Sequence, residues 1–180
     1  MEENKRIDTL YRMYVRDLFS YALNLGFDRD TSMDAIHDVF CKICADKKLP
    51  EKIANPRFYL LRAMKNRLLD LYKLRKEIPG LSPETLAEEI PFTVQVTMED
   101  RLIEQEEQEK IRLKVEQLLG TLTDRQREII YLRYTLDCDY EEIAQLMHIT
   151  LPGCRKLFHN AIVKLRKNPS FAFLLLFLIG

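Results

Sequence analysis

Five cations and no acidic residue occupy the stretch 151–167 near the end of the chain. Arg155, Lys156 and His159 lie at three- to four-residue spacing, which places them together on the outer face of a helix whose other face is apolar. The major groove of duplex DNA accepts a cationic helix of this kind. We therefore expect Arg155, Lys156, His159 and Lys164 to contact bases and phosphates. On spacing alone, an amphipathic surface helix with solvated charges is the alternative.

A second basic stretch, 57–76, carries seven cations and one acid, Asp70, with aromatic residues between them. Cations follow the phosphates of a nucleic acid strand, and aromatic faces stack on unpaired bases at about 1–3 kcal/mol each. The simpler interpretation is a solvated basic helix with Phe58 and Tyr72 in its core. For these two aromatic residues we expect the core position, and for the cations we expect contact with DNA.

The elements that must position these residues are helices, because apolar residues recur at three- and four-residue steps and Gly and Pro are few. Helix signals include Gly26 as a stop, Asp28 or Asp30 as a cap, Asn55-Pro56 as a start, and the capping box Thr123-Asp-Arg-Gln126. A second capping-box signal begins at Asp139 and predicts another helix start. A short turn at 148–150 and a final helix from 151 to 167 follow it, and this order predicts a helix-turn-helix.

Charge is distributed in blocks, although the chain carries 28 basic and 28 acidic residues. Residues 1–76 have a net charge of +5, residues 77–110 have −8 and residues 111–180 have +3. Local sign decides what each block attracts, since distant charges are screened. We expect an all-α protein of two small helical domains, at 1–76 and 110–168. An acidic linker at 77–109 joins them, and an apolar tail, 169–180, follows.

Several motifs resemble the sigma-70 family of transcription initiation factors. Residues 122–134 (LTDRQREIIYLRY), then 140–144 (YEEIA), then the basic helix resemble sigma region 4. Residues 34–40 (DAIHDVF) resemble the region 2 motif D-x-x-Q-D-x-F, and NPRFYL from Asn55 and NRLLD at 66–70 resemble the stretches that follow it. Both halves occur in the family's order. The short chain and the missing further regions resemble the extracytoplasmic-function subgroup.

The resemblance implies a division of labour between two sites on promoter DNA. Region 2 would dock on the β′ clamp of core RNA polymerase and capture the melted −10 element. Region 4 would read the −35 element as duplex and touch the β flap, and the linker would run through the polymerase channels. An anti-sigma factor as partner and an envelope or environmental signal are also implied.

Residue roles follow from the same resemblance, with the loop 46–55 placed to hold a flipped base. Polymerase docking would use Asp34, His37, Asp38 and Phe40. Contact with the −10 element would use Lys47, Lys48, Arg57, Arg62, Lys65, Asn66 and Lys73, and contact with the −35 element would use Arg155, Lys156, His159 and Lys164. The chain departs from the family at His37, where Gln is usual, and at Cys41 and Cys44, which replace bulky apolar residues. Gly153 and Asn160 depart from the usual recognition helix.

His37, Cys41 and Cys44 have the spacing of a zinc motif, since i, i+4 and i+7 share a helix face. They lie inside the region 2 pattern with no fourth ligand nearby, so we expect packed cysteines and no metal. The glutamates at 104–109 are typical of a solvated helix face. We find no phosphate loop, nucleophile elbow or metal helix, and expect neither enzymatic activity, a small-molecule substrate nor a cofactor.

The N-terminal residues lack the apolar segment of a signal peptide, and the apolar run 171–179 is too short for a membrane span. We therefore expect a cytoplasmic protein without stable membrane insertion. The run 171–179 is expected to pack within the chain or on a partner. Two alternatives to a sigma factor stay open: a helix-turn-helix regulator that works without polymerase, and a zinc or thiol redox-sensing interaction protein.

Overall fold

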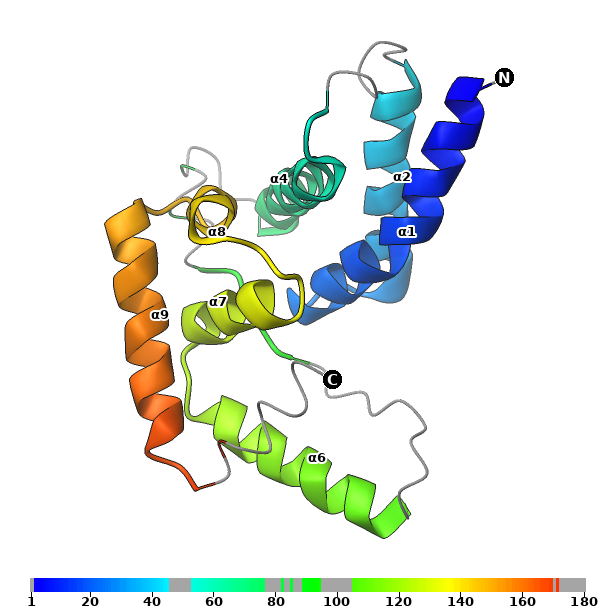
Figure 1. Ribbon diagram of the computed structural model, residues 1–180. Coiled ribbons are helices and arrows are strands. Elements are labelled where there is room, and N and C mark those ends of the chain that lie inside the picture. The colour runs from blue at the N-terminus through cyan, green and yellow to red at the C-terminus, as the bar shows by residue number, and fades with distance from the viewer. Residues whose placement is uncertain are drawn as a thin grey trace. The chain divides into compact units, whose positions relative to one another are not determined.

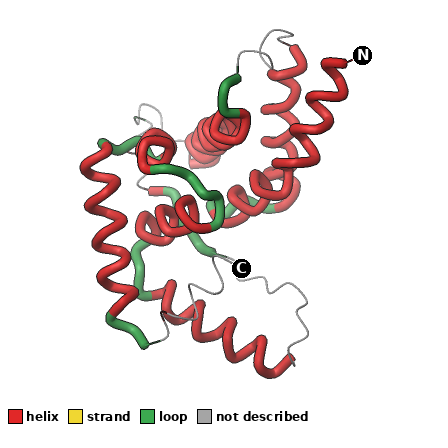
Figure 2. Tube along the Cα trace, in the orientation of Figure 1, coloured by secondary structure: helices red, strands yellow, loops and turns green. Residues whose placement is uncertain are grey.

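The computed structural model describes residues 2–45, 53–76, 82, 85, 89–94, 105–169 and 171. The chain divides into two compact units. The first comprises residues 1–90 together with 145–148, and the second comprises residues 91–144 and 149–180. Seven helices and no strand are present in the described ranges (Figures 1 and 2).

The first unit is built from three helices, α1 (Glu2–Asn24), α2 (Arg29–Ala45) and α4 (Pro56–Lys76), each of which packs on the other two (Figure 1). Their facing stripes form a core in which the side chains are at most 1% exposed. The core includes Leu18, Tyr21, Ile36, Ile43, Leu60, Leu61, Met64 and Leu68. Burial of each such side chain stabilises the unit by about 1.5–3 kcal/mol before entropy is considered.

Local signals set the ends of these helices. Gly26 follows α1 with a φ of 81°, a left-handed conformation that glycine adopts without steric cost. Asp28 caps α2, because its carboxylate accepts hydrogen bonds from the Thr31 amide and hydroxyl, both at 2.8 Å. These bonds hold the pKa of Asp28 below its usual value. Asn55 caps α4 by accepting from the Phe58 amide at 3.1 Å.

The second unit contains α6 (Gln105–Gly120), α7 (Asp124–Tyr134), α8 (Tyr140–Leu146) up to Ala144, and α9 (Leu151–Arg166), with α7 packed against α9. The expected capping box at the start of α7 is present: Thr123 accepts from the Gln126 amide, and the Gln126 side chain accepts from the Thr123 amide. The same reciprocal arrangement joins Asp139 and Glu142 before and within α8. These caps fix where the helix-turn-helix begins.

Part of the expected linker is packed into the second unit. Pro91–Val94 is non-helical, and Phe92 and Val94 are 0% and 9% exposed. The Phe92 ring lies 5.5 Å from the Tyr131 ring of α7, measured between centroids. The last residues of the expected linker, from 105 on, belong to α6. Residues 91–94 therefore contribute to a folded unit as well as to a connection.

Within the described residues, no helix has the length and apolarity that a membrane crossing requires. The apolar run 171–179 lies outside the described residues except for Phe171. That residue is half-buried, and its amide donates to the Asn168 carbonyl at 3.0 Å.

Candidate nucleic-acid interface

The turn between α8 and α9 is fixed by backbone contacts. The Ile149 amide donates to the Ala144 carbonyl at 2.9 Å, and His148 adopts a positive φ of 52°. Ala144 is buried, as expected for a small residue where two helices approach closely. Few residues other than glycine adopt a positive φ. At His148 this left-handed conformation ends α8 and turns the chain toward α9.

The start of α9 is capped by Thr150, whose hydroxyl accepts from the Gly153 amide at 3.2 Å. A Cβ atom on Gly153 would lie 3.0 Å from that hydroxyl oxygen, closer than such contacts normally are. The glycine that departs from the family pattern therefore leaves room for the cap. A Thr N-cap stabilises a helix by about 1 kcal/mol. This is comparable to the free-energy cost of placing glycine instead of alanine within the helix.

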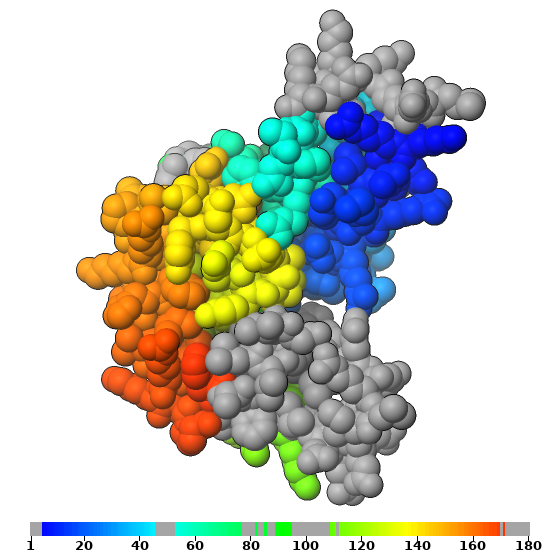
Figure 3. All heavy atoms as spheres, viewed as in Figure 1, coloured from blue at the N-terminus to red at the C-terminus, as the bar shows by residue number. Residues whose placement is uncertain are grey.

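The outer face of α9 carries the expected cations. Arg155, Lys156 and His159 are all exposed, whereas Cys154, Ala161 and Leu165 are buried on the opposite face. Phe158 joins that packed side, with its ring centroid 5.5 Å from the ring of Tyr140. In the space-filling view the side chains of α9, in orange, project from the surface (Figure 3).

Lys164 is exposed, but its side chain also connects α9 to α7. Its ammonium group donates to the side-chain oxygen of Gln126 at 3.2 Å, which ties α9 to the capping box of α7. This oxygen is the same acceptor that receives the Thr123 amide. A role in orienting α9 is thus visible for Lys164 beside the expected role in DNA contact.

On α4, three of the residues expected at the −10 element share one side of the helix. Arg62, Asn66 and Lys73 fall at i, i+4 and i+11, so their positions cluster on one face. Arg62 and Asn66 are exposed, and Lys73 is half-buried. Arg57 is half-buried at the start of the helix. Lys47 and Lys48 lie outside the described residues.

Lys65 does not fit this face. Its side chain is 1% exposed, and its ammonium group lies 5.6 Å from the centroid of the Tyr21 ring. A cation over an aromatic face is a packing interaction within the first unit. The helix phase therefore turns Lys65 toward the core, unlike Arg62 and Asn66, and its contact with DNA stays a prediction that this burial does not favour.

The two aromatic residues of α4 that were expected in the core are only partly buried. Phe58 and Tyr72 are both half-buried. The Tyr72 hydroxyl donates to the Glu89 carbonyl at 3.4 Å, and the Lys76 ammonium lies 5.8 Å from the Tyr72 ring centroid. Neither side chain is therefore fully buried.

On α2, some of the residues expected to dock polymerase are exposed, whereas others contact neighbouring helices. Asp34 and His37 are exposed on one face. Asp38 forms an ion pair with Arg67 of α4, with the Nη2–Oδ2 and Nε–Oδ2 distances both 2.7 Å. Asp38 thus holds α2 against α4 in addition to whatever it contributes to docking.

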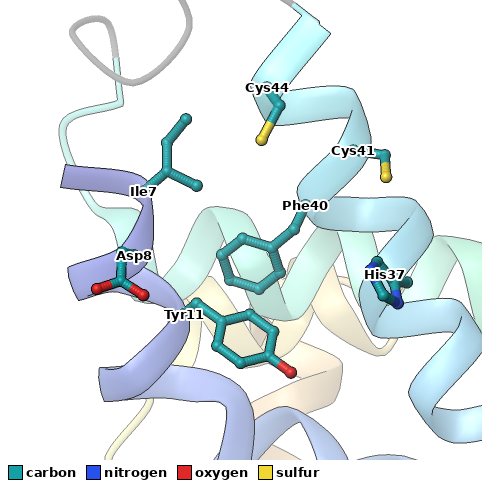
Figure 4. A pocket seen from close by; sticks show the side chains of 7 residues that line it. All are labelled: Ile7, Asp8, Tyr11, His37, Phe40, Cys41 and Cys44. Carbon is teal, nitrogen blue, oxygen red and sulfur yellow. The ribbon is translucent and has the colours of Figure 1, made fainter. Parts of the chain in front are cut away.

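Phe40 is 5% exposed and faces Tyr11 of α1, with ring centroids 5.1 Å apart in an edge-to-face arrangement. The pair lines a shallow hollow of about 410 Å³ between α1 and α2, drawn in Figure 4. Ile7 and Cys44 stand beside the rings at one end of this hollow. Phe40 therefore packs beneath the exposed face of α2, and little of its side chain is accessible to a docking partner.

The expectation that Cys41 and Cys44 are packed is wrong, because both are exposed while Cys138 and Cys154 are buried. The buried stripe of α2 runs through Ile36, Val39, Phe40 and Ile43, and the helix phase leaves 41 and 44 beside it. Cys41 shares the exposed face of Asp34 and His37, and this exposure was not predicted from the sequence. Among the described residues, no group of three His, Cys, Asp or Glu side chains is placed to hold a metal ion.

Alkylation should distinguish the two kinds of cysteine. We expect iodoacetamide at neutral pH to modify Cys41 and Cys44 of the folded chain, and to leave Cys138 and Cys154 unmodified until the chain unfolds. Burial raises the pKa of Cys154 to about 11, which removes the reactive thiolate. Peptide mass spectrometry measures the pattern; rapid native-state labelling of Cys154 would contradict the packing of α9.

Comparison with known proteins gives three matches. A model of "Sigma-70 region 2" matches residues 10–77, and a model of "Sigma-70, region 4" matches residues 112–165. The chain is also 24% identical, over 169 residues, to the "RNA polymerase sigma factor YlaC" of Bacillus subtilis (strain 168), covering 93% of this chain and 94% of that protein. The two regions match the three-helix unit and the helix-turn-helix unit, respectively.

A helical unit of sigma region 2 followed by a helix-turn-helix of region 4 defines a factor that gives RNA polymerase its promoter specificity. The chain belongs to the sigma-70 family, in its extracytoplasmic-function group. Sigma-70 domains of these two kinds imply binding of core RNA polymerase and of promoter DNA.

Proposed function

We propose that this chain binds core RNA polymerase through the first unit and directs it to promoters whose −35 element is read by α9. The exposed cationic face of α9, with Arg155, Lys156 and His159, is the observation that carries the proposal. N-terminal residues of a recognition helix contact base edges, and cations further along reach phosphates. Arg155 is the best suited to read a guanine, because its guanidinium can donate two parallel hydrogen bonds.

The first unit would capture the melted −10 element along α4. Arg62, Asn66 and Lys73 supply cationic and amide groups on one face, and Tyr59, which is half-buried, lies close to that face in helix phase. The expected base-holding loop, 46–55, lies largely outside the described residues, so this role rests on the family resemblance.

Polymerase docking would use the exposed face of α2, with Asp34, His37 and Cys41 at its surface and Phe40 and the Asp38–Arg67 pair beneath them. The proposed site of action is the cytoplasm, where polymerase works. An anti-sigma factor and an envelope or environmental signal complete the proposal by analogy with the group.

Transcription by purified core polymerase on fragments of the source genome tests this function. Addition of the chain should produce transcripts from a small set of fragments that share two sequence elements. A conventional helix-turn-helix regulator predicts another outcome: tight, sequence-specific binding by the chain without polymerase, and no transcription on its addition.

A further inference from the structure

Two exposed thiols lie close together at the C-terminal end of α2. Cys41 and Cys44 are exposed, whereas Cys138 and Cys154 are buried. Residues three positions apart are neighbours on the surface of a helix, so the two exposed thiols are neighbours as well. Cys44 is followed by Ala45, where α2 ends, and therefore lies in the last turn of the helix. The end of α2 thus presents two accessible thiols that can react with one another.

The same two cysteines border the hollow between α1 and α2 (Figure 4). Ile7, Tyr11 and Phe40 line this hollow between the helices. Reaction of a thiol requires that the reagent reach the sulfur atom. The hollow therefore gives a small reagent room beside both thiols.

Helix geometry decides how easily a disulfide closes between these positions. The Cβ atoms of residues three apart on a helix are about 5–6 Å from each other, whereas a relaxed disulfide holds them about 3.5–4.5 Å apart. Closure therefore requires the backbone to move by about 1 Å or more. Helix ends open at little free-energy cost, so the last turn of α2, with Cys44, is where this movement falls.

A disulfide that closes in this way is strained as well as exposed. Strained or exposed disulfides are easily reduced, and they are the ones that serve regulation or catalysis. Disulfides in the reducing cytoplasm are usually transient and redox-sensing. The Cys41–Cys44 pair is therefore suited to reversible oxidation under oxidising conditions and unsuited to a permanent cross-link.

Oxidation of the pair would alter the surface that is proposed to dock polymerase. Asp34, His37 and Cys41 share the exposed face of α2, and Cys41 lies one helical turn beyond His37. Movement of Cys44 toward Cys41 changes the backbone at the end of this face. A covalent change at the two thiols is therefore coupled to docking.

We propose that Cys41 and Cys44 form a thiol-exchange site that takes the disulfides of small thiols as substrates, and that its oxidation weakens polymerase docking. One cysteine thiolate attacks a sulfur of the small disulfide, whose S–S bond breaks and releases a thiolate. The second cysteine thiolate attacks the protein sulfur of the mixed disulfide, forms the Cys41–Cys44 bond and releases the other small thiolate. The released thiolates take up the two protons that the cysteines lose. The protein is oxidised by two electrons, and the small disulfide is reduced to two thiols.

Oxidised glutathione, added to the reduced full-length chain, tests the exchange. Remaining thiols are blocked with N-ethylmaleimide, and tryptic peptides are identified by mass spectrometry. Trypsin cleaves after Lys42, between the two cysteines, so the disulfide joins peptides 30–42 and 43–47, which otherwise separate. We expect the joined peptide to form and dithiothreitol to divide it again. Thiols that stay free, or glutathione adducts that persist without the joined peptide, would overturn the site.

Single substitutions check the two steps separately. Cys41→Ser and Cys44→Ser each keep one exposed thiol, so each variant should retain one glutathione adduct and form no joined peptide. Both replaced side chains are exposed, so the melting temperature should stay close to that of the unmodified chain. A disulfide from the remaining exposed thiol to Cys138 or Cys154 in either variant would contradict the assignment of the pair.

Polymerase binding measures the consequence, and this part of the inference rests on the proposed function. Oxidised and reduced chains are freed of small reagents by gel filtration and titrated against labelled core polymerase. Oxidation should lower affinity by about fivefold or more, in the usual range of coupling between two equilibria. By the reciprocity of this coupling, bound polymerase should make the pair harder to oxidise by the same factor.

The doubly substituted chain, Cys41→Ser with Cys44→Ser, is the matched control. Treatment with oxidised glutathione should leave its affinity for core polymerase at the value measured before treatment. Unchanged affinity of the unmodified chain after the Cys41–Cys44 bond has formed would overturn the inference. Failure of the reduced, unmodified chain to bind core polymerase would instead overturn the proposed function.

Discussion

Replacing Arg155 with alanine should weaken binding of the polymerase-bound chain to a −35 duplex by about 5- to 150-fold, which corresponds to 1–3 kcal/mol for one lost bidentate base contact. Binding to core polymerase should change by less than about twofold, because Arg155 is exposed on the outer face of α9. Fluorescence anisotropy with a labelled duplex, and a separate titration with labelled core polymerase, measure the two affinities.

Arg166 offers a matched control for this substitution. It is an exposed arginine on the same helix, but in its last turn, away from the end that enters the groove. Arg166→Ala should lower affinity by a similar small factor for every duplex sequence, whereas Arg155→Ala should also relax the preference at one base pair. Equal losses of duplex binding and polymerase binding on Arg155→Ala would count against a role for α9 in DNA recognition.

Replacing Phe40 with alanine should lower the free energy of unfolding of the first unit by about 3–5 kcal/mol, because it removes a buried ring packed edge-to-face on Tyr11. Most small units are stable by only 5–15 kcal/mol, so a large part of the stability would be lost. Polymerase binding should fall as a consequence. Hydrogen exchange of the α1 and α2 amides measures the stability of this unit separately from the other.

His37→Ala separates docking from folding on the same helix. His37 is exposed, so its removal should change the stability of the first unit by no more than about 0.5 kcal/mol while weakening polymerase binding. Phe40→Leu, which restores most of the volume, should recover stability and binding together. Selective loss of polymerase binding by Phe40→Ala at unchanged stability would show that Phe40 itself contacts the polymerase.

Helix ends were predictable from the sequence because their causes are local. The Thr123–Gln126 capping box, Asn55 before Pro56 and Gly26 after α1 each act within four residues of the chain. The structure also resolves the choice between Asp28 and Asp30, since Asp28 accepts both Thr31 bonds. No tertiary information was needed for these positions.

Lys65, Cys41 and Phe92 show where the burial of a side chain was not predictable from the sequence alone. Grouping cations by proximity placed Lys65 with its basic neighbours, although its position next to Met64 and three residues before Leu68 puts it on the buried side of α4. A cysteine is compatible with either face, so only packing decides Cys41. The burial of Phe92 was not predicted, because the residue lies in an acidic stretch that was interpreted as a linker. Apolar residues at every second position, Ile90, Phe92 and Val94, are the pattern that could have predicted a covered extended segment.

Run-off transcription from a mapped promoter is the most direct test of the central claim. Core polymerase supplied with this chain should synthesise RNA from one position just downstream of the −10 element, and neither component should do so by itself. Substituting either promoter element should abolish the product. Scattered initiation indistinguishable from that of core polymerase without the chain would contradict the account.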